Sequence, residues 1–216
     1  MSRAARQVFP NVPHPITQRG NGRENVFFCD DDKALYLAWL VDYCDKHTVT
    51  IIAYCLLDNH IHLIHTPSAE DNFVEVLKPL HMRYAQDIDK QKGWTGHLWQ
   101  GRFFSSALDE AHTQAGIRYV ERNPVAANMV KKSEDYKWSS AAHHCGLVDN
   151  KTLLNKPNQL TGIGQTDWAG WLSEPENPDF IKVLERNIEQ GLPCGSDSFI
   201  SLLEKQVKRN LPFRPQ

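Results

Sequence analysis

The sequence predicts an α+β protein whose elements follow the order β-α-β-β-α-β, with further helices toward the C-terminal end. Two observations predict it. Stretches rich in β-branched and aromatic residues alternate along the chain with stretches of helical periodicity. Two of the predicted strands are separated by only two residues, which is typical of a β-hairpin. This order is that of the split β-α-β, or ferredoxin-like, antiparallel sheet.

The first half of the chain supplies a strand, a helix and the hairpin. The strand begins in PITQRGNGRENVFF (residues 15–28) and ends in a Gly/Asn turn that carries Arg19 and Arg23. The acidic run 30–32 then starts a helix that extends to about residue 47. Segments 48–58 and 60–65 form the hairpin around the break Asp58-Asn59. The apolar residues of the helix recur at helical spacing: Leu35, Trp39, Leu40 and Tyr43.

The second half supplies a helix, a strand and a helix. Segment 69–93 is helical in pattern, and Pro79 predicts a kink or break within it. A fourth strand is expected over 96–109, followed by a helix over 110–123. That helix is expected to end at Asn123, because Pro124 disfavours helical geometry in the residue before it. Beyond residue 145 we expect loops, short helices around Trp168 and Trp171, and a final helix over 196–210.

The composition is that of an ordinary soluble protein. The 216 residues are 41% hydrophobic and 23% charged, with a net charge of −2, which argues mildly against a non-specific DNA coater. No apolar run is long enough to cross a membrane and no signal peptide is evident, so a cytoplasmic location without a membrane partner is expected. The five cysteines contain no C-x-x-C pair, which argues against a disulfide framework or a thiolate zinc site.

Two histidines on the second hairpin strand could hold a metal ion. Alternate residues of a strand point to one face, so His60 and His62 project together while His65 projects to the other side. Two imidazoles held on a rigid strand can grip a divalent cation. The motif is short, and a pair of surface or hydrogen-bonded histidines is the alternative.

Tyr119 and Asn123 form a second candidate pair. They lie four residues apart in a predicted helix, hence on one face and one turn from each other. The asparagine amide oxygen is a neutral ligand, and the tyrosine would stand beside any metal so bound. The alternative is a half-buried aromatic residue next to a helix C-cap.

Several ordered blocks of the sequence resemble the REP-associated tyrosine transposases of the HUH single-strand nuclease superfamily. The resemblance covers about residues 10–145, and GLPCGSDSFISLLE is similar to the C-terminal segment of that family. It implies a catalytic domain over 1–145 and a C-terminal helical and loop extension over 146–216 that packs on it. The blocks are PITQRGN, AYCLLDNHIHLI, GHLWQGRF, RYVERNPVAANMV and DYKWSSAAHH.

The resemblance also implies roles for the residues above. His60 and His62 match the paired histidines, Asn123 the polar third ligand and Tyr119 the nucleophile. The family consists of metal-dependent single-strand DNA endonucleases and strand transferases. They cleave beside short imperfect hairpins and leave a 5′-phosphotyrosine and a free 3′-hydroxyl. Mg²⁺ or Mn²⁺ is the expected cofactor, although imidazole and amide ligands suit Zn²⁺ or Ni²⁺ as well.

Other residues are candidates for DNA contacts. Arg102 lies among Trp99 and Phe103, a mixture of cation and aromatic rings that can hold a backbone while bases stack; a core strand with one surface arginine is the alternative. Arg118 and Arg122 could reach phosphates from the tyrosine face, or could be solvated partners of nearby glutamates. Arg19 is a weaker candidate.

Two departures from the family pattern and two other functions stay open. Asp58 stands where a proline is expected, and the tail RNLPFRPQ is less basic than expected. The chain could be a regulator that binds hairpin DNA without cleaving it, or a zinc phosphoesterase in which Tyr119 is structural. Monomer and homodimer are both compatible with the sequence.

Overall fold

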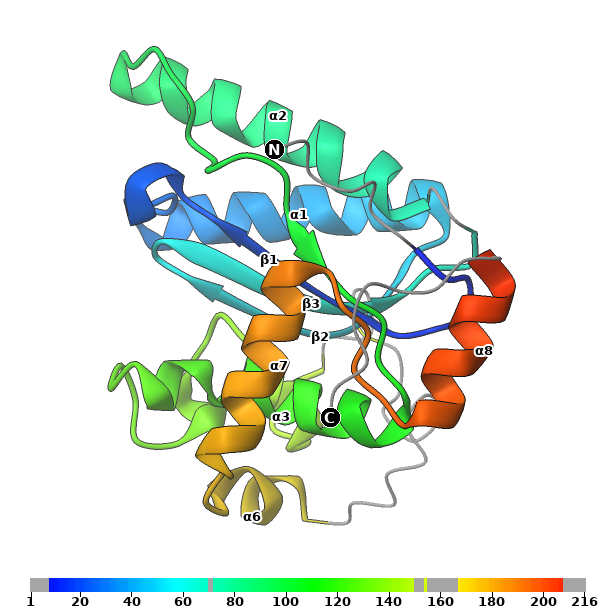
Figure 1. Ribbon diagram of the computed structural model, residues 1–216. Coiled ribbons are helices and arrows are strands. Elements are labelled where there is room, and N and C mark those ends of the chain that lie inside the picture. The colour runs from blue at the N-terminus through cyan, green and yellow to red at the C-terminus, as the bar shows by residue number, and fades with distance from the viewer. Residues whose placement is uncertain (1–7, 70–71, 150–153, 155–166, 208–216) are drawn as a thin grey trace.

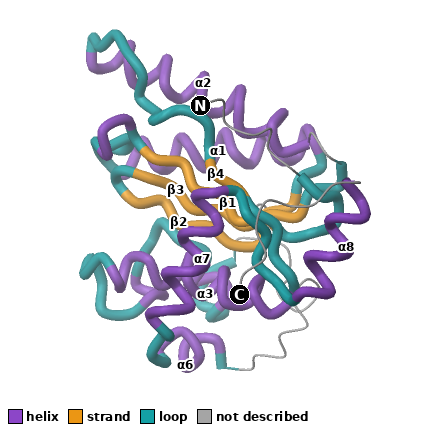
Figure 2. The backbone as a smooth tube through the Cα atoms, viewed as in Figure 1, coloured by secondary structure: helices purple, strands orange, loops and turns teal. Residues whose placement is uncertain are grey.

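A computed structural model of the protein describes residues 8–69, 72–149, 154 and 167–207. Its centre is an antiparallel sheet in the strand order β2-β3-β1-β4, which confirms the predicted α+β, ferredoxin-like order. Strand β3 therefore lies inside the sheet, paired on both edges, with helices on both faces (Figures 1 and 2). The strands are β1 (His14–Arg19), β2 (Thr50–Leu57), β3 (His60–Thr66) and β4 (Phe104–Ser105).

Helices α1 (Asp30–His47) and α2 (Asn72–Lys92) cover one face of the sheet (Figure 1). The acidic run does start α1, because the Asp32 carboxylate accepts from the backbone N–H groups of Phe28 and Cys29. Pro79 lies inside α2, which continues through it. The apolar sides of both helices pack with the sheet into one large core.

Helix α3 (Glu110–Ala126) covers the other face and runs against β2 and β3. A Cβ atom at Gly116 would lie 3.1 Å from Cδ1 of Leu108 and 3.3 Å from Cδ1 of Ile64, so the glycine permits this close approach. The prediction that the helix ends at Asn123 is wrong. Pro124 falls in the last turn, where it removes one backbone hydrogen bond and leaves the remaining turn intact.

The fourth strand is much shorter than predicted. Only Phe104 and Ser105 pair with β1, although the preceding segment runs beside β1 through a bridge between Gly20 and Trp99. Gly101 interrupts the pairing, because its φ of 130° is incompatible with a regular strand.

The C-terminal region contributes more helix than the sequence predicts. Short helix α6 (Trp168–Ser173) and helix α8 (Asp197–Val207) agree with expectation, although residues 208–210 of the predicted last helix lie outside the described residues. Short helix α4 (Ala141–His144) was not predicted. Helix α7 (Pro178–Gln190) falls in a region predicted to be loop, and it packs against β1 and β4. The described residues also contain two 3-10 turns, η1 (Asn21–Arg23) and η2 (Ser133–Asp135).

A buried carboxylate ties α3 to the segments that follow it. Glu121 is 0% exposed and accepts hydrogen bonds from the Ser140 hydroxyl, the His144 imidazole and the Trp168 indole. A buried charge is tolerated only when it is satisfied in this way. Across the described part of the chain, no helix has the length and apolar character needed to span a membrane.

Candidate active site

His60 and His62 lie on the face of β3 that α3 covers. Their ring centroids are 4.8 Å apart, and the His62 ring meets the Tyr119 ring edge-on at 5.3 Å. His65 lies on the opposite face, as predicted, stacked at 3.5 Å on Phe73 of α2. Strand alternation and the placement of α3 thus bring the two histidines and the tyrosine together.

Both imidazoles have a hydrogen-bond partner at Nδ1. Nδ1 of His60 donates to Oδ1 of Asn59 at 2.6 Å, and Nδ1 of His62 lies 3.0 Å from Oγ1 of Thr17. Each ring therefore has Nε2 left as its second nitrogen, and Nε2 of His62 is buried without a hydrogen-bond partner among the described residues. A metal ligand with its other nitrogen hydrogen-bonded has this arrangement.

Both imidazoles are held neutral. Burial, together with the positive charge of Arg19, lowers the pKa of His60 to about 4. Burial, His60 and Arg19 lower the pKa of His62 well below its ordinary value. A neutral imidazole is the form that binds a metal ion, so the pair has ligand character throughout the neutral range.

The Tyr119 hydroxyl donates to a carboxylate from α7. Its oxygen lies 2.9 Å from Oε1 of Glu185. Burial raises the pKa of the phenol, and the Glu185 charge raises it further; a hydrogen bond with Asn123 and the charge of Arg19 act in the opposite direction. The phenol is thus protonated at neutral pH and already hydrogen-bonded to a group that can accept its proton.

Arg19 and Asn123 complete the surroundings. Arg19 faces His60 in the pairing of β1 with β3, and its guanidinium lies 3.7 Å from Glu189, one turn from Glu185 on α7. Asn123 donates from Nδ2 to the Tyr119 carbonyl at 3.3 Å. The described residues contain no group of three histidine, cysteine or acidic side chains that could hold a metal.

Comparison with known proteins identifies the chain. The model of the family described as IS200-like transposases matches residues 14–123, just over half of the 216 residues.

The chain belongs to the IS200-like transposase family.

A protein of Haemophilus influenzae with the provisional name REP-associated tyrosine transposase is 26% identical over 108 residues, which are 45% of this chain and 61% of that protein. The resemblance seen in the sequence is therefore confirmed.

Two solved structures are also similar to this IS200-like chain. A REP-associated tyrosine transposase bound to a REP hairpin has a TM-score of 0.57 and 19% identity, over 72% of this chain and 92% of that one, and it shows the shared fold. A provisionally named transposase from Deinococcus radiodurans has a TM-score of 0.39 and 22% identity, over 57% of this chain and 97% of that one.

In this IS200-like transposase the candidate DNA-binding residues fall in three places. Arg19 lies at the histidine site. Arg118 pairs with Glu174 and Arg122 with Glu176, so both guanidinium groups bind the segment after α6. The sequence offered nearby glutamates as possible partners of these arginines, whereas the observed partners lie more than 50 residues downstream. Trp99, Arg102 and Phe103 line a groove beside α2.

The acidic residues that α7 brings to the site were not predicted from the sequence. Glu185 and Glu189 were not singled out, although the helix that carries them had recognisable signals: Asn177 as N-cap, Pro178 in the first turn and Gly191 in a left-handed conformation after the last. Asp58 lies in the turn between β2 and β3 and forms a 2.6 Å ion pair with Lys33 of α1.

Proposed function

We propose that this IS200-like transposase cuts and rejoins single-stranded DNA, with Tyr119 as the nucleophile. The observation that carries the proposal is the position of the Tyr119 phenol, edge-on to His62 and hydrogen-bonded to Glu185. A nucleophile, a proton acceptor and two neutral imidazoles in one site are the parts that phosphoryl transfer to a protein hydroxyl requires.

The chemistry of this chain's own residues balances as follows. The Tyr119 oxygen attacks the phosphorus of a phosphodiester while Glu185 takes the phenolic proton. The new bond joins the tyrosine oxygen to the 5′-phosphate, and the bond from phosphorus to the 3′ oxygen breaks. The 3′ oxygen takes a proton from solvent and leaves as a free hydroxyl. Because the phosphodiester is replaced by a phosphotyrosine of similar energy, a second 3′-hydroxyl can reverse the reaction without ATP.

A divalent cation, Mn²⁺ or Mg²⁺, fits the proposed site, with Zn²⁺ or Ni²⁺ able to take the same ligands. The orphaned Nε2 of His62 supports this, as do the Nδ1 hydrogen bonds of both histidines. Nε2 of His60 and of His62 and the amide oxygen of Asn123 would hold the ion. When bound, it would polarise the phosphate and stabilise the charge that develops during transfer.

The proposed substrate is single-stranded DNA that contains a short imperfect hairpin. The solved relative of similar fold is described as bound to a REP hairpin, and this supports the same class of partner here. We also propose that residues 1–145 form the catalytic domain and that 146–216 form an extension packed on it, from which α7 supplies Glu185 to the site. The packing of α7 on β1 and β4 and the family match over 14–123 support that division.

The test is covalent capture. The protein is incubated with labelled hairpin DNA and Mn²⁺, and a denaturing gel is examined for a protein–DNA adduct. The wild type should form the adduct, Tyr119→Phe should form none while binding DNA normally, and Tyr43→Phe, which removes a hydroxyl from α1, should react like wild type.

Two other outcomes would replace the proposal. DNA binding without any adduct from the wild type would identify a non-cleaving regulator. Hydrolysis of a simple phosphodiester by Tyr119→Phe would identify a phosphoesterase in which the tyrosine is structural.

A further inference from the structure

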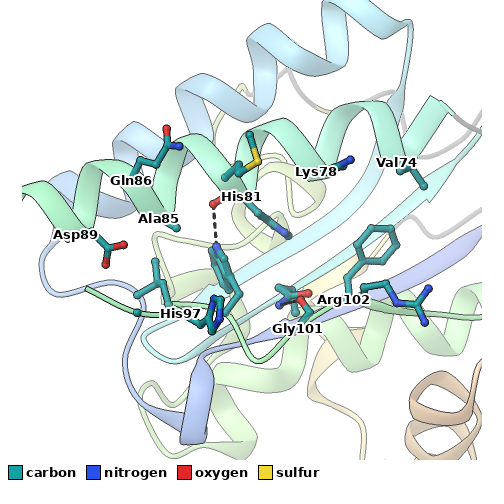
Figure 3. A pocket seen from close by; sticks show the side chains of 15 residues that line it. Val74, Lys78, His81, Ala85, Gln86, Asp89, His97, Gly101 and Arg102 are labelled. Atoms are coloured by element: carbon teal, nitrogen blue, oxygen red, sulfur yellow. Dashed lines mark hydrogen bonds between the residues drawn. The ribbon is translucent and has the colours of Figure 1, made fainter. Parts of the chain in front are cut away.

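A groove of about 600 Å³ lies between α2 and the segment 96–103, on the far side of β1 from the two histidines. Its volume is within the range of small-molecule sites. Figure 3 shows α2 along one side and the 96–103 segment along the other. The indole N–H of Trp99 donates to the His81 carbonyl at 3.1 Å, which joins the two walls. No step of the proposed cleavage uses this groove.

The walls of the groove present flat and polarisable surfaces. The Trp99 ring packs at 4.6 Å from the His81 ring, and Phe103 and Met82 line the same groove. Met82 is 57% exposed on a helix whose other apolar residues are mostly buried. Aromatic rings and a thioether are surfaces on which a planar ring can stack.

Charge is distributed unevenly along the groove. Lys78 and Arg102 lie toward one end, and Gln86 and Asp89 lie toward the other (Figure 3). Neither Lys78 nor Arg102 forms an ion pair with the described residues. Two cations beside an apolar wall fit a ligand that carries an anion next to a flat ring.

Gln18 contributes an unsatisfied acceptor. It lines the groove and is 2% exposed, and its Nε2 donates to the Gly101 carbonyl at 3.1 Å. Its Oε1 is buried and has no hydrogen-bond partner among the described residues. A buried acceptor without a partner is unfavourable, so a bound ligand that donates an N–H there would gain affinity.

We propose that this groove binds one unpaired nucleotide of the DNA substrate. The inference rests on the proposed function for the identity of the polymer. The base would stack on the Trp99 wall and donate an N–H to Gln18, while its phosphate would lie near Lys78 and Arg102. In a duplex, pairing occupies the imino N–H groups and both ring faces are stacked. The groove therefore selects a nucleotide outside the hairpin stem.

The experiment is an abasic scan read by fluorescence anisotropy without divalent metal, so that binding is measured and cleavage is not. Hairpin DNAs carry a single-stranded flank in which one nucleotide at a time lacks its base. In the wild type, one position should weaken binding roughly tenfold, the effect of losing one stacked base. Met82→Glu, which places a carboxylate in the groove, should bind the intact DNA roughly tenfold more weakly and show no sensitive position.

Leu202→Glu is the matched control. It makes the same change of charge at an apolar residue of α8 that is 54% exposed, and it should retain the wild-type scan. A flat scan in the wild type would overturn the inference, and so would a sensitive position that persists in Met82→Glu. If the wild type shows one sensitive position in the abasic scan but forms no Tyr119 adduct, only the proposed cleavage is overturned. If it forms the adduct but shows no sensitive position, only the proposed groove is overturned.

A second measurement does not depend on any variant. Wild-type protein is irradiated with DNA that carries a halogenated uracil at the sensitive position, and the cross-linked peptide is sequenced. Cross-links should fall on Trp99, Phe103 or Met82. Cross-links confined to residues outside the groove would overturn the inference.

Discussion

The hydrogen bond between Tyr119 and Glu185 has two opposite effects on the tyrosine. The carboxylate raises the pKa of the phenol, which disfavours a standing phenolate. The same carboxylate is positioned to take the proton as the oxygen attacks, when a general base has its effect. The proposed nucleophile is therefore activated during the reaction and not before it.

Glu185→Gln should slow adduct formation by about a hundredfold, because an amide of the same shape cannot accept the phenolic proton. The rate is followed by quenched time points on a denaturing gel. DNA affinity should be unchanged. Glu189→Gln, one turn away on α7, is the matched control and should keep the rate within about threefold of wild type, since Glu189 contacts Arg19 and not the phenol. Equal rates for wild type and Glu185→Gln would exclude this role for Glu185.

Thr17→Val should raise the Mn²⁺ concentration needed for half-maximal adduct formation by about tenfold, with little loss of stability. The reason is that Oγ1 of Thr17 is the partner of Nδ1 of His62, and such partners orient metal ligands. Thr113→Val removes a hydroxyl whose hydrogen bond, among the described residues, is to the Asp109 carbonyl, and its metal dependence should match wild type. An unchanged metal requirement for Thr17→Val would contradict the assigned orientation.

Sequence reasoning placed together those candidate residues whose spacing is local. The two histidines share a face through strand alternation, and Tyr119 and Asn123 share one through the helical repeat. Glu185 could not be found in this way, because its contact with Tyr119 spans 66 residues of sequence and depends on how α7 packs. Local periodicity contains no information on such a contact.

At the scale of elements, the errors lie where tertiary packing overrides local preference. Pro124 is tolerated near the end of α3, and one glycine with positive φ shortens β4 to two residues. Helix α7 was missed because the surrounding segment is rich in Gly, Pro and Asn, although its own end signals are strong. Elements with continuous periodicity, such as α1 and the β2–β3 hairpin, were predicted correctly.

Gly116→Val should push α3 away from the sheet. The added side chain would overlap Leu108 and Ile64, and overpacking of this kind costs about 1 to 3 kcal/mol. The midpoint of urea unfolding should fall accordingly. Adduct formation should fall further than the loss of folded protein explains, because Tyr119 lies on the same helix, one turn from residue 116. A variant with wild-type stability and activity would show that α3 does not need this close contact.

At the scale of the whole molecule, buried neutral histidines make stability depend on pH. Burial lowers the pKa of His14 to about 4 and of His81 to about 3. The unfolded chain binds protons at these groups near their ordinary pKa, and the folded chain does not. The contribution of these two groups to the free energy of unfolding is therefore fully present above about pH 7 and is lost as the pH falls toward 4.

Lowering the pH from 7.5 to 5 should reduce the free energy of unfolding by about 1 to 2 kcal/mol for each such histidine. Urea titrations across this range measure the slope. His14→Gln should reduce it, whereas His97→Gln, which changes an exposed histidine, should leave it unchanged. A pH-independent midpoint would show that the buried histidines are accommodated in charged form.

The overall order of strands followed from the sequence because each strand and helix has its own period and the hairpin turn is short. The arrangement of the C-terminal helices did not, because their positions depend on distant partners such as the buried Glu121 carboxylate. The sequence therefore predicted the order of strands in the central sheet but not the positions of the C-terminal helices.

Adjacent residues of β1 face opposite ways: Thr17 and Arg19 toward the histidines, Gln18 toward the groove. A single polymer that reached both sides would have to bend sharply around the sheet edge at β4. Duplex DNA, with a persistence length of about 150 base pairs, is too stiff for such a turn. A few unstacked nucleotides are pliable enough, so a substrate that used both the proposed cleavage site and the proposed groove would need a minimum length of free strand between the stem and the scissile bond.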